Sequence, residues 1–260
     1  MKVRSRSGSR GPTAAMIAAL IAAALVIAAI VWWPRDSAQR SGRPTAAEAP
    51  ADQSRQLREQ DVPALDLPAL DASDAFVREF VTGLSEHPQL ASWLVTDDLA
   101  YRFVRSTVAL AHGQSPREHV DFMTPEGDFA VQERDGGLAV DPAGYSRYNL
   151  LAEIFSSLST ENGARLYRQL YPLFEEAFAE LGVPNVTFDD LTSQAVDNLI
   201  AAQVPASPPA VAPSTAMYAY TDSRLEARSP AEKHLMRMGP QNAARVQAKL
   251  RELRDAIWTN

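Results

Sequence analysis

The residues from Thr13 to Trp33 form an apolar run that constrains this chain more than any other segment, because no charged side chain interrupts it. A helix rises about 1.5 Å per residue and the hydrocarbon core of a bilayer is about 30 Å thick, so roughly 20 apolar residues can cross it. A helix also satisfies all of its backbone polar groups inside lipid. Trp32 and Trp33 end the run with side chains that favour the membrane–water boundary. The run therefore predicts a single transmembrane helix over residues 13–33.

Two alternatives to a retained anchor are a cleaved signal peptide and a buried core helix. A signal peptide has an apolar stretch of about 7–15 residues and then small residues at the cleavage site. Here the run is longer and is followed by two indole side chains and Pro34, which suit a signal peptidase poorly. The chain has no cysteine, so anchoring through a lipid-modified cysteine is excluded.

The charges that flank the run predict its orientation. Basic residues gather before it, at Lys2, Arg4, Arg6 and Arg10. The basic residues that follow it, with Asp36 among them, are Arg35, Arg40 and Arg43. Because the side with more Lys and Arg stays in the cytoplasm, residues 1–12 are expected to be cytoplasmic. The protein is then expected in the bacterial inner membrane, with its main domain in the periplasm.

The remainder of the chain is acidic. Residues 1–47 hold seven of the 25 Lys and Arg residues and one of the 32 Asp and Glu residues, so the rest carries 18 basic and 31 acidic residues, a formal net charge of −13. An acidic domain argues against nucleic acid as a partner, because binding to phosphates requires a basic surface. The absence of cysteine excludes disulfides and cysteine-based metal sites.

Composition and periodicity divide the chain after the apolar run into two parts. Residues 34–71 are rich in Pro, Ala and charge and predict a flexible linker, whose apolar end VPALDLPAL can pack on the domain as an extended arm. Residues 72–260 show apolar residues at helical spacing, interrupted by FAVQERDGGLAV, which alternates around Asp135-Gly136 and predicts a β-hairpin. The expected fold class is mainly α: one compact helical domain with an inserted β-hairpin.

Several residues predict where the helices begin and end. We expect Ser73 and Thr96 to cap helices, Asp141-Pro142 to open one, and Pro172 to kink or divide another. Capping boxes are expected at Thr187–Asp190 and Ser229–Glu232, and a stop and restart at Gly239-Pro240. Residues 204–216 predict a Pro-rich loop, with a short extended segment at MYAYTD.

Five segments together resemble a bacterial family known by its sequences alone, the domain-of-unknown-function family 3014. They are HPQLASWLVTDDL, SPREHVDF, DPAGYSRYNLLAEIF, RLYRQLYPLFEEAFAELG and SPAEKHLMRMGPQNAARVQAKLREL. The likeness covers most of residues 65–257. It implies a membrane-anchored proteobacterial protein, and it transfers no catalytic residue.

Tyrosine and arginine gather in two of these segments and are candidates for an interaction surface. The residues are Tyr145, Arg147, Tyr148, Arg165, Tyr167, Arg168 and Tyr171. Both residue types favour binding surfaces, because each offers a flat body and directed hydrogen-bond donors. If their two helices are antiparallel neighbours, some of these side chains line one groove for an anionic peptide or cell-wall fragment. The alternative is that the rings border the core and the arginines pair with nearby acids.

Other candidate chemistry is weaker. His119 and Asp121 could begin a metal site, but no third ligand stands at a diagnostic spacing, and a His–carboxylate hydrogen bond explains the pair. Glu175 and Glu176 are adjacent, so on a helix they point in different directions and suit a glycosidase poorly. The sequence assigns no catalytic residue, metal or cofactor.

The expected function is therefore a non-enzymatic interaction or scaffold module of the cell envelope. The bilayer is its expected contact through Thr13 to Trp33, and an envelope protein or cell-wall component is its expected partner. The alternative is an enzyme that acts on cell-wall peptidoglycan through a site without a sequence signature.

Overall fold

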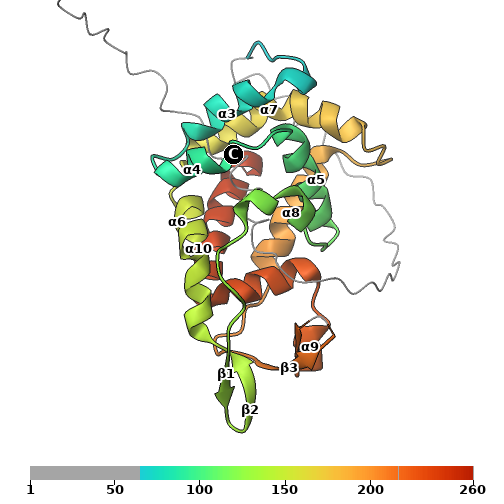
Figure 1. Cartoon of the computed structure of the whole chain (residues 1–260). Helices are drawn as coiled ribbons and strands as arrows, with labels where there is room; N and C mark the ends of the chain where they lie inside the picture. The colour runs from blue at the N-terminus through green and yellow to red at the C-terminus, as the bar shows by residue number, and fades with distance from the viewer. Residues whose placement is uncertain (1–64, 216, 260) are drawn as a thin grey trace, which may run out of the picture.

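The computed structural model describes residues 65–215 and 217–259 (Figure 1). The α-helices are α3 (Asp74–Thr82), α4 (Pro88–Trp93), α5 (Leu99–Ala111), α6 (Asn149–Ser156), α7 (Thr160–Ala179), α8 (Phe188–Ala201), α9 (Ser223–Glu226) and α10 (Pro230–Trp258). The 3₁₀ helices are η1 (Leu70–Ala72), η2 (Arg117–His119), η3 (Asp121–Met123) and η4 (Pro142–Tyr148). The strands are β1 (Val131–Arg134), β2 (Gly137–Val140), β3 (Ala210–Ser214) and β4 (Met217–Tyr220).

The predicted cytoplasmic segment 1–12, the predicted transmembrane helix 13–33 and most of the predicted linker 34–71 lie outside the described residues. Among the helices from residue 65 onward that the structure describes, none has the length and apolar character needed to cross a bilayer. The expectation of a mainly helical domain is confirmed for the described part of the chain.

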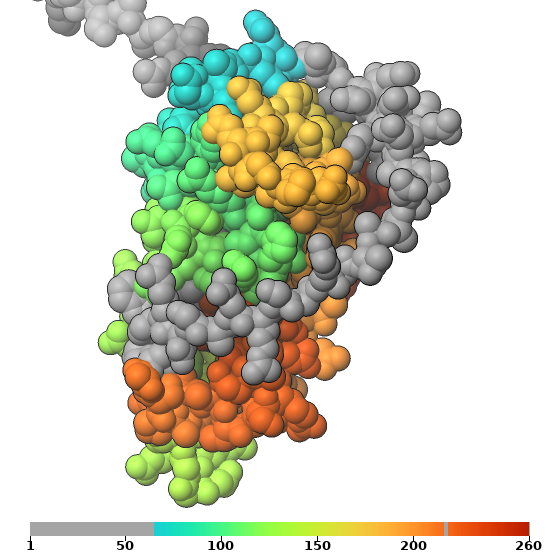
Figure 2. All heavy atoms as spheres, turned by 90° about the vertical axis from the view of Figure 1, so that its right-hand side faces the viewer, coloured from blue at the N-terminus to red at the C-terminus, as the bar shows by residue number. Residues whose placement is uncertain are grey.

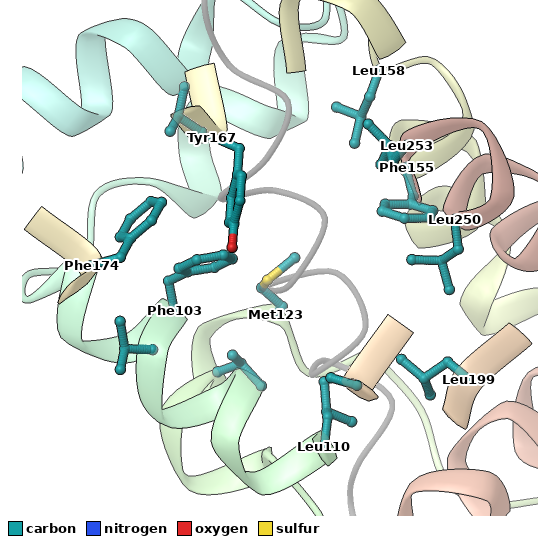
Figure 3. Close-up of a cluster of buried hydrophobic side chains, with 14 of the residues drawn as sticks. Phe103, Leu110, Met123, Phe155, Leu158, Tyr167, Phe174, Leu199, Leu250 and Leu253 are labelled. Atoms are coloured by element: carbon teal, nitrogen blue, oxygen red, sulfur yellow. The ribbon is translucent and has the colours of Figure 1, made fainter. Parts of the chain in front are cut away.

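The core lies between α5, α7, α8 and α10, which contact one another along their apolar faces. Its densest part is aromatic (Figure 3). The ring centroid of Phe174 lies 4.5 Å from that of Phe103 on α5 and 5.8 Å from that of Phe188 on α8. All three rings are buried, so one aromatic side chain of α7 joins three helices that are distant in sequence.

The end of the predicted linker packs on the domain as expected. Leu70, in η1, is buried in the core, and Leu67 packs against the core from the segment before it. η1 contacts α7. The chain therefore enters the domain beside α7.

The prediction that Thr96 caps α5 is wrong. The N-cap residue of α5 is Asp98, which has a left-handed backbone (φ 61°) and whose side chain makes no capping hydrogen bond. The carboxylate of Asp74 takes that role: it accepts hydrogen bonds from the backbone N–H groups of Asp98 (2.7 Å) and Leu99 (2.8 Å). A negative group at a helix N-terminus satisfies free donors and complements the helix dipole, so α3 stabilises the start of α5 through Asp74.

Replacing Asp74 with alanine should lower the free energy of unfolding by about 0.5–2 kcal/mol, the usual effect of removing a capping side chain. Urea denaturation of the purified full-length protein measures it. Asp71→Ala is the matched control, because Asp71 is exposed and precedes Asp74 by one turn. Equal stability of the two variants would contradict the role of Asp74.

The other predicted helix boundaries are confirmed in part. Thr187 with Asp190 and Ser229 with Glu232 form the two expected capping boxes. Ser73 precedes α3, but its hydroxyl donates to the carbonyl of Leu70 (2.7 Å) and does not cap the helix. The sequence predicts that Pro172 kinks or divides its helix; it does not divide it, because α7 runs through Pro172 as one helix. Buried residues on both sides of Pro172 hold the two halves against the same core.

The predicted hairpin is confirmed and belongs to a larger sheet. β1 and β2 are antiparallel, and Asp135 and Gly136 both have positive φ, as a two-residue hairpin turn requires. The prediction of a loop over residues 204–216 is wrong in part: β3 pairs with β2 and with β4, giving the order β1-β2-β3-β4. Pro213 is tolerated in β3 because the pairing with β2 involves only Ala210 and Val211, so Pro213 has β4 as its strand neighbour.

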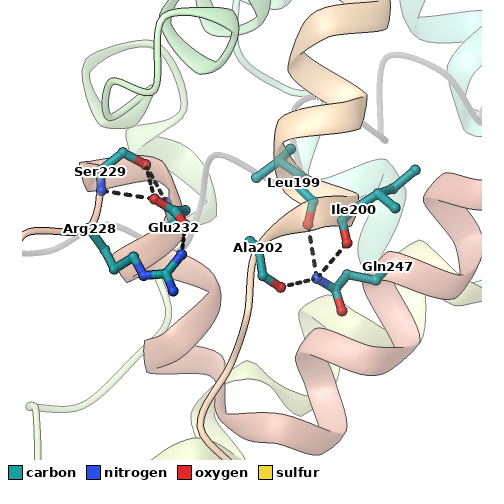
Figure 4. A network of polar contacts seen from close by, with 7 residues as sticks. All are labelled: Leu199, Ile200, Ala202, Arg228, Ser229, Glu232 and Gln247. Atoms are coloured by element: carbon teal, nitrogen blue, oxygen red, sulfur yellow. Dashed lines mark hydrogen bonds and ion pairs between the residues drawn. The ribbon is translucent and has the colours of Figure 1, made fainter. Parts of the chain in front are cut away.

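The helix α10 has a break at Gly239, which has non-helical backbone angles (φ 76°, ψ 165°), as the Gly-Pro pair predicts. After the break, Gln247 holds the end of α8: its side-chain amide donates to the carbonyl oxygens of Leu199 (2.9 Å) and Ala202 (2.8 Å) (Figure 4). Before the break, Glu232 accepts hydrogen bonds from Ser229 and Arg228 in the same view.

Candidate functional site

The seven Tyr and Arg candidates form two groups, one at the break in α10 and the other at its C-terminal end. Tyr145, Arg147 and Tyr148 belong to η4, and the ring of Tyr145 covers Gly239. The other four belong to α7, where Arg168 donates a hydrogen bond to the carbonyl of Ala256. At 1.5 Å per residue, Gly239 and Ala256 are on the order of 25 Å apart along the helix. The structure therefore does not bring all seven side chains into one groove.

The α7 group holds the end of α10 in place. The hydroxyl of Tyr167 and the indole N–H of Trp258 donate to the same carboxylate oxygen of Asp189, at 2.9 and 3.0 Å. Burial raises the pKa of Tyr167 well above its usual value, and the charge of Asp189 adds to the effect. Arg168 donates to carbonyl oxygens in the last turn of α10, which are free acceptors at a helix end. These side chains join α7, α8 and α10.

The two remaining members of this group have local partners. Tyr171 donates to the carboxylate of Glu175, which also accepts the backbone N–H of Phe188 at the start of α8 (3.2 Å). Arg165 is exposed and donates to Asn162 one turn earlier. Glu175 thus satisfies a free backbone donor at the start of α8.

The η4 group meets the first part of α10 and the strand β4. We call Arg147, Tyr148, Tyr220, His234 and Arg237 the Arg237 cluster. Arg147 donates to the hydroxyl of Tyr148 (2.7 Å) and its guanidinium lies 4.8 Å from the centre of that ring. Arg237 lies 3.2 Å from Nδ1 of His234. The cluster therefore combines side chains from three elements that only the fold brings together.

Burial and like charge shape the electrostatics of the cluster. Burial lowers the pKa of Arg237, and the neighbouring charge of Arg147 acts in the same direction, whereas Tyr220 and Tyr148 oppose it. Burial raises the pKa of Tyr220 to about 12. Glu226 is the carboxylate that acts on Arg237, and it also accepts a hydrogen bond from Lys233 (2.6 Å). The cluster is thus locally basic within an acidic chain.

His234 is the buried titratable base of the cluster, with 3 % of its surface exposed. Burial lowers its pKa well below the usual value, and the charges of Arg237 and Arg117 lower it further. A guanidinium only donates hydrogen bonds, so Nδ1 accepts from Arg237 and the neutral ring carries its proton on Nε2. Among residues 65–215 and 217–259, no atom accepts a hydrogen bond from that N–H.

The stability of the fold should fall as the pH decreases below the usual histidine pKa of about 6.5, because the unfolded chain then binds a proton that the folded chain excludes at His234. The difference in unfolding free energy between the unsubstituted protein and His234→Gln isolates this contribution. Denaturation above and below the usual pKa should show the difference changing in favour of the variant in acid. His112→Gln is the control, because His112 is exposed. A pH-independent difference at position 234 would refute the prediction.

The weaker candidate pair, His119 and Asp121, is held by the guanidinium group of Arg102. Nη1 of Arg102 donates to the backbone carbonyl of His119 (3.0 Å) and to the carboxylate of Asp121 (3.2 Å). The imidazole of His119 has a lowered pKa because of burial and then the charge of Arg105. Within residues 65–215 and 217–259, no group of three His, Asp or Glu side chains is placed to hold a metal ion.

Two of the five residues of the Arg237 cluster, Arg147 and Tyr148, are among the interaction candidates that the sequence predicts. His234 and Arg237 are three positions apart on a helix. This spacing places both side chains on one face and could have suggested that they contact each other. Tyr220 carries no such signal, because its contact with the cluster depends on the pairing of β3 with β4.

These features define a mainly helical domain with a small antiparallel sheet and a basic, tyrosine-rich cluster at the sheet end. A family model described as "Protein of unknown function (DUF3014)" matches residues 99–254, and the chain belongs to this family. The match confirms the resemblance seen in the sequence and includes all five residues of the Arg237 cluster. No curated protein and no solved structure is detectably similar to the chain.

Proposed function

We propose that this protein is a non-enzymatic binding module held at the bacterial inner membrane. Residues 13–33 would anchor it as a single transmembrane helix with the N-terminus in the cytoplasm. The described domain would then stand in the periplasm on a linker and bind an anionic component of the envelope. The charge asymmetry around residues 13–33 supports the orientation.

The observation that carries the proposal is the position of the Arg237 cluster relative to the entry of the chain. The linker ends at Leu67 and Leu70, where η1 packs beside α7. The cluster lies at the other end of α10, next to the sheet and α9 (Figure 1). In Figure 2 the cyan surface after residue 65 lies at the top of the face shown, and the orange surface lies far below it, just above the light-green surface at the bottom. A tethered domain of this form presents the cluster away from its anchor.

The composition of the cluster fits binding. Arginine and tyrosine are enriched among the residues that dominate interaction energies, because they combine flat contact area with directed donors. Tyr145, Arg147, Tyr220 and Arg237 are each partly exposed, so a partner can contact them. The local excess of guanidinium groups selects for an anionic partner.

Photo-crosslinking in living cells tests the proposal. In one variant, a photoreactive amino acid replaces Ser146, an exposed residue of η4 directly before Arg147. In the matched variant, it replaces Glu161, an exposed residue of α7. We expect adducts with an envelope component from position 146 and not from position 161. Adducts of equal yield from both positions, or from neither, would refute the assignment of the binding end. Protease accessibility of the domain in spheroplasts checks the predicted orientation.

A further inference from the structure

The two edges of the sheet differ in how they are covered. β1 and β4 are the outer strands of the order β1-β2-β3-β4. At the β4 edge, the backbone N–H of Tyr220 donates to the carboxylate of Glu226 (2.9 Å), and α9, which carries Glu226, packs against the strand. The helix α9 therefore occupies part of the β4 edge.

The β1 edge is open. The carbonyl of Ala130 accepts the N–H of Asp141 at the end of β2 (3.0 Å), so the backbone groups of Ala130 point toward β2. Backbone direction alternates along a strand, so the N–H and C=O groups of Val131 and Glu133 point away from β2. Within residues 65–215 and 217–259, no atom pairs with these groups. A row of unpaired backbone groups at a sheet edge is a template for a further strand.

The position and the charges of β1 restrict which strand can be added. In Figure 1 the β1-β2 hairpin projects beyond the helices at the end of the molecule opposite α3 and α4, so a second chain can approach it. Glu133 and Arg134, at the outer end of β1, are exposed. Charged side chains ordinarily keep edge strands from pairing, so only a strand with matching charges fits this edge.

The segment that contains β1 matches itself. Residues 128–134 read DFAVQER, with an acid at one end and a base at the other. When two copies of this segment pair antiparallel with Val131 opposite Val131, Arg134 of each copy lies opposite Asp128 of the other. Asp128 and Arg134 are both exposed. They fall in pairs without direct backbone hydrogen bonds, where opposing side chains approach most closely, so two ion pairs can form.

Other antiparallel registers of the same strand lack this match. A register centred on Gln132 places Arg134 opposite Ala130, which carries no charge. A register centred on Glu133 places two carboxylates directly opposite each other, which is unfavourable. Charge therefore favours the register centred on Val131.

We propose that β1 pairs with β1 of a second copy of this chain, antiparallel and centred on Val131, so that two sheets become one continuous sheet across a twofold axis. The two Val131 residues exchange backbone hydrogen bonds, and Asp128 forms an ion pair with Arg134 on each side. The chain directly before Asp128 is held in place, because Arg147 donates a hydrogen bond to the carbonyl of Gly127 (3.0 Å). An ordered segment thus presents Asp128 to the second copy.

The contact between two short strands is small, less than the roughly 800 Å² per partner of a standard interface. Membrane anchoring compensates for the small area, and this step rests on the proposed function. Copies anchored in one membrane are confined, which raises the effective concentration of the second strand. Residues 34–64 can span up to about 100 Å, so the anchors leave the two domains free to adopt opposite orientations.

Cysteine crosslinking of the full-length protein tests the register. The chain contains no cysteine, so a single introduced cysteine reports one contact. In Val131→Cys, the two Cα atoms of the central pair lie about 5.5 Å apart, a distance that a disulfide can bridge. In Glu133→Cys, the matched control on the same edge, the two positions are about 13 Å apart along the strands.

We expect oxidation with copper–phenanthroline to give a linked dimer from position 131 and not from position 133, in cell membranes and in purified protein. Equal yields from the two positions, or no dimer from either, would overturn the proposal. A dimer in purified protein alone would retain the strand pairing and count against the membrane anchor.

Charge reversal provides the second measurement. Arg134→Asp, added to Val131→Cys, should lower the yield of the dimer about fivefold or more, because both ion pairs become repulsive. Further addition of Asp128→Arg should restore the yield. Arg251→Asp is the matched control, because Arg251 is exposed on α10 and should leave the yield unchanged. An unchanged yield in Arg134→Asp, or no recovery with Asp128→Arg, would refute the register.

A mixed experiment replaces Val131→Cys if that variant does not fold. Copies with Asp128→Cys and copies with Arg134→Cys, each with its own tag, are produced in the same cells. Both positions are exposed, so these substitutions leave the packing of the domain unchanged. We expect the mixed dimer to form and the two dimers of like copies to be absent. All three dimers in random proportion would contradict the proposed pairing.

The dimer and the proposed function can fail separately. Crosslinks through position 131 without adducts at position 146 retain the dimer and reject the envelope partner. Adducts at position 146 without crosslinks through position 131 retain the binding module and reject the dimer.

Discussion

Replacing Phe174 with alanine should lower the free energy of unfolding by about 3–5 kcal/mol, the range expected when a large aromatic side chain is removed from a packed core. The side chain is fully buried and contacts the rings of Phe103, Tyr167 and Phe188. The loss combines the transfer of the ring to solvent with the cavity that it leaves. The neighbouring rings come from α5, α7 and α8, so collapse into that cavity would require these helices to move together. Urea denaturation followed by circular dichroism measures the change.

Two further variants make this prediction specific. Phe174→Leu keeps most of the volume and should cost clearly less than the alanine variant. Phe122→Ala removes the same ring from a partly exposed position and should also cost less. A loss at Phe174→Ala no larger than that at Phe122→Ala would mean that the aromatic cluster is not the centre of the core.

Replacing Gly239 with alanine should destabilise the fold by about 2–4 kcal/mol, because the added methyl group meets both backbone strain and a clash. The residue has a positive φ of 76°, a conformation that side chains with a Cβ disfavour. A Cβ built at this position lies 2.5 Å from Cγ and Cδ2 of the Tyr145 ring. Accommodation would displace η4 from α10 and thus disturb the Arg237 cluster.

Another glycine separates the two effects. Gly182 also has a positive φ of 64°, but a Cβ there has no atom within 4 Å. Gly182→Ala therefore pays for the backbone conformation alone, about 1–2 kcal/mol. In a Tyr145→Ala background, the Gly239→Ala substitution should cost less than in the unsubstituted protein but still more than Gly182→Ala, because a φ of 76° with a ψ of 165° is a backbone conformation almost confined to glycine. Equal costs of Gly239→Ala with and without the Tyr145 ring would show that the clash does not matter.

Local signals in the sequence predicted the local structure well. The alternation around Asp135-Gly136 produced β1 and β2, and the capping-box spacings at Thr187 and Ser229 mark the starts of α8 and α10. Each of these signals acts within a few residues, between side chains and backbone groups that are neighbours in the chain. The same holds for the break at Gly239-Pro240, where one residue without a Cβ precedes one without an N–H.

Two of the failed predictions involve partners that are distant in the chain. Thr96 has the right chemistry for a cap, but Asp74 from another helix provides the carboxylate for α5. Residues 204–216 contain prolines that favour a loop, yet β2 supplies a neighbouring strand for Ala210 and Val211. In both cases a long-range contact outweighed a local preference, because the free energy of packing exceeds that of propensity.

The candidate interaction surface shows the same division. The sequence identified tyrosine and arginine as the relevant residue types, and it placed Arg147 and Tyr148 in what became the Arg237 cluster. It had no means of separating them from Tyr167 and Arg168, which hold the end of α10. Composition and spacing reveal which side chains are present, whereas their partners depend on the path of the chain.

The sequence alone determined the family, the mainly helical character of the domain, the first hairpin and the position of the break in α10, because each is encoded in the order of adjacent residues. Only the tertiary structure decided that His234 is buried beside Arg237, and that its Nε2 has no acceptor among the residues that the structure describes. Burial is the physical reason. It removes water from the imidazole of His234 and the guanidinium group of Arg237. This burial depends on how elements distant in the chain pack around the two side chains.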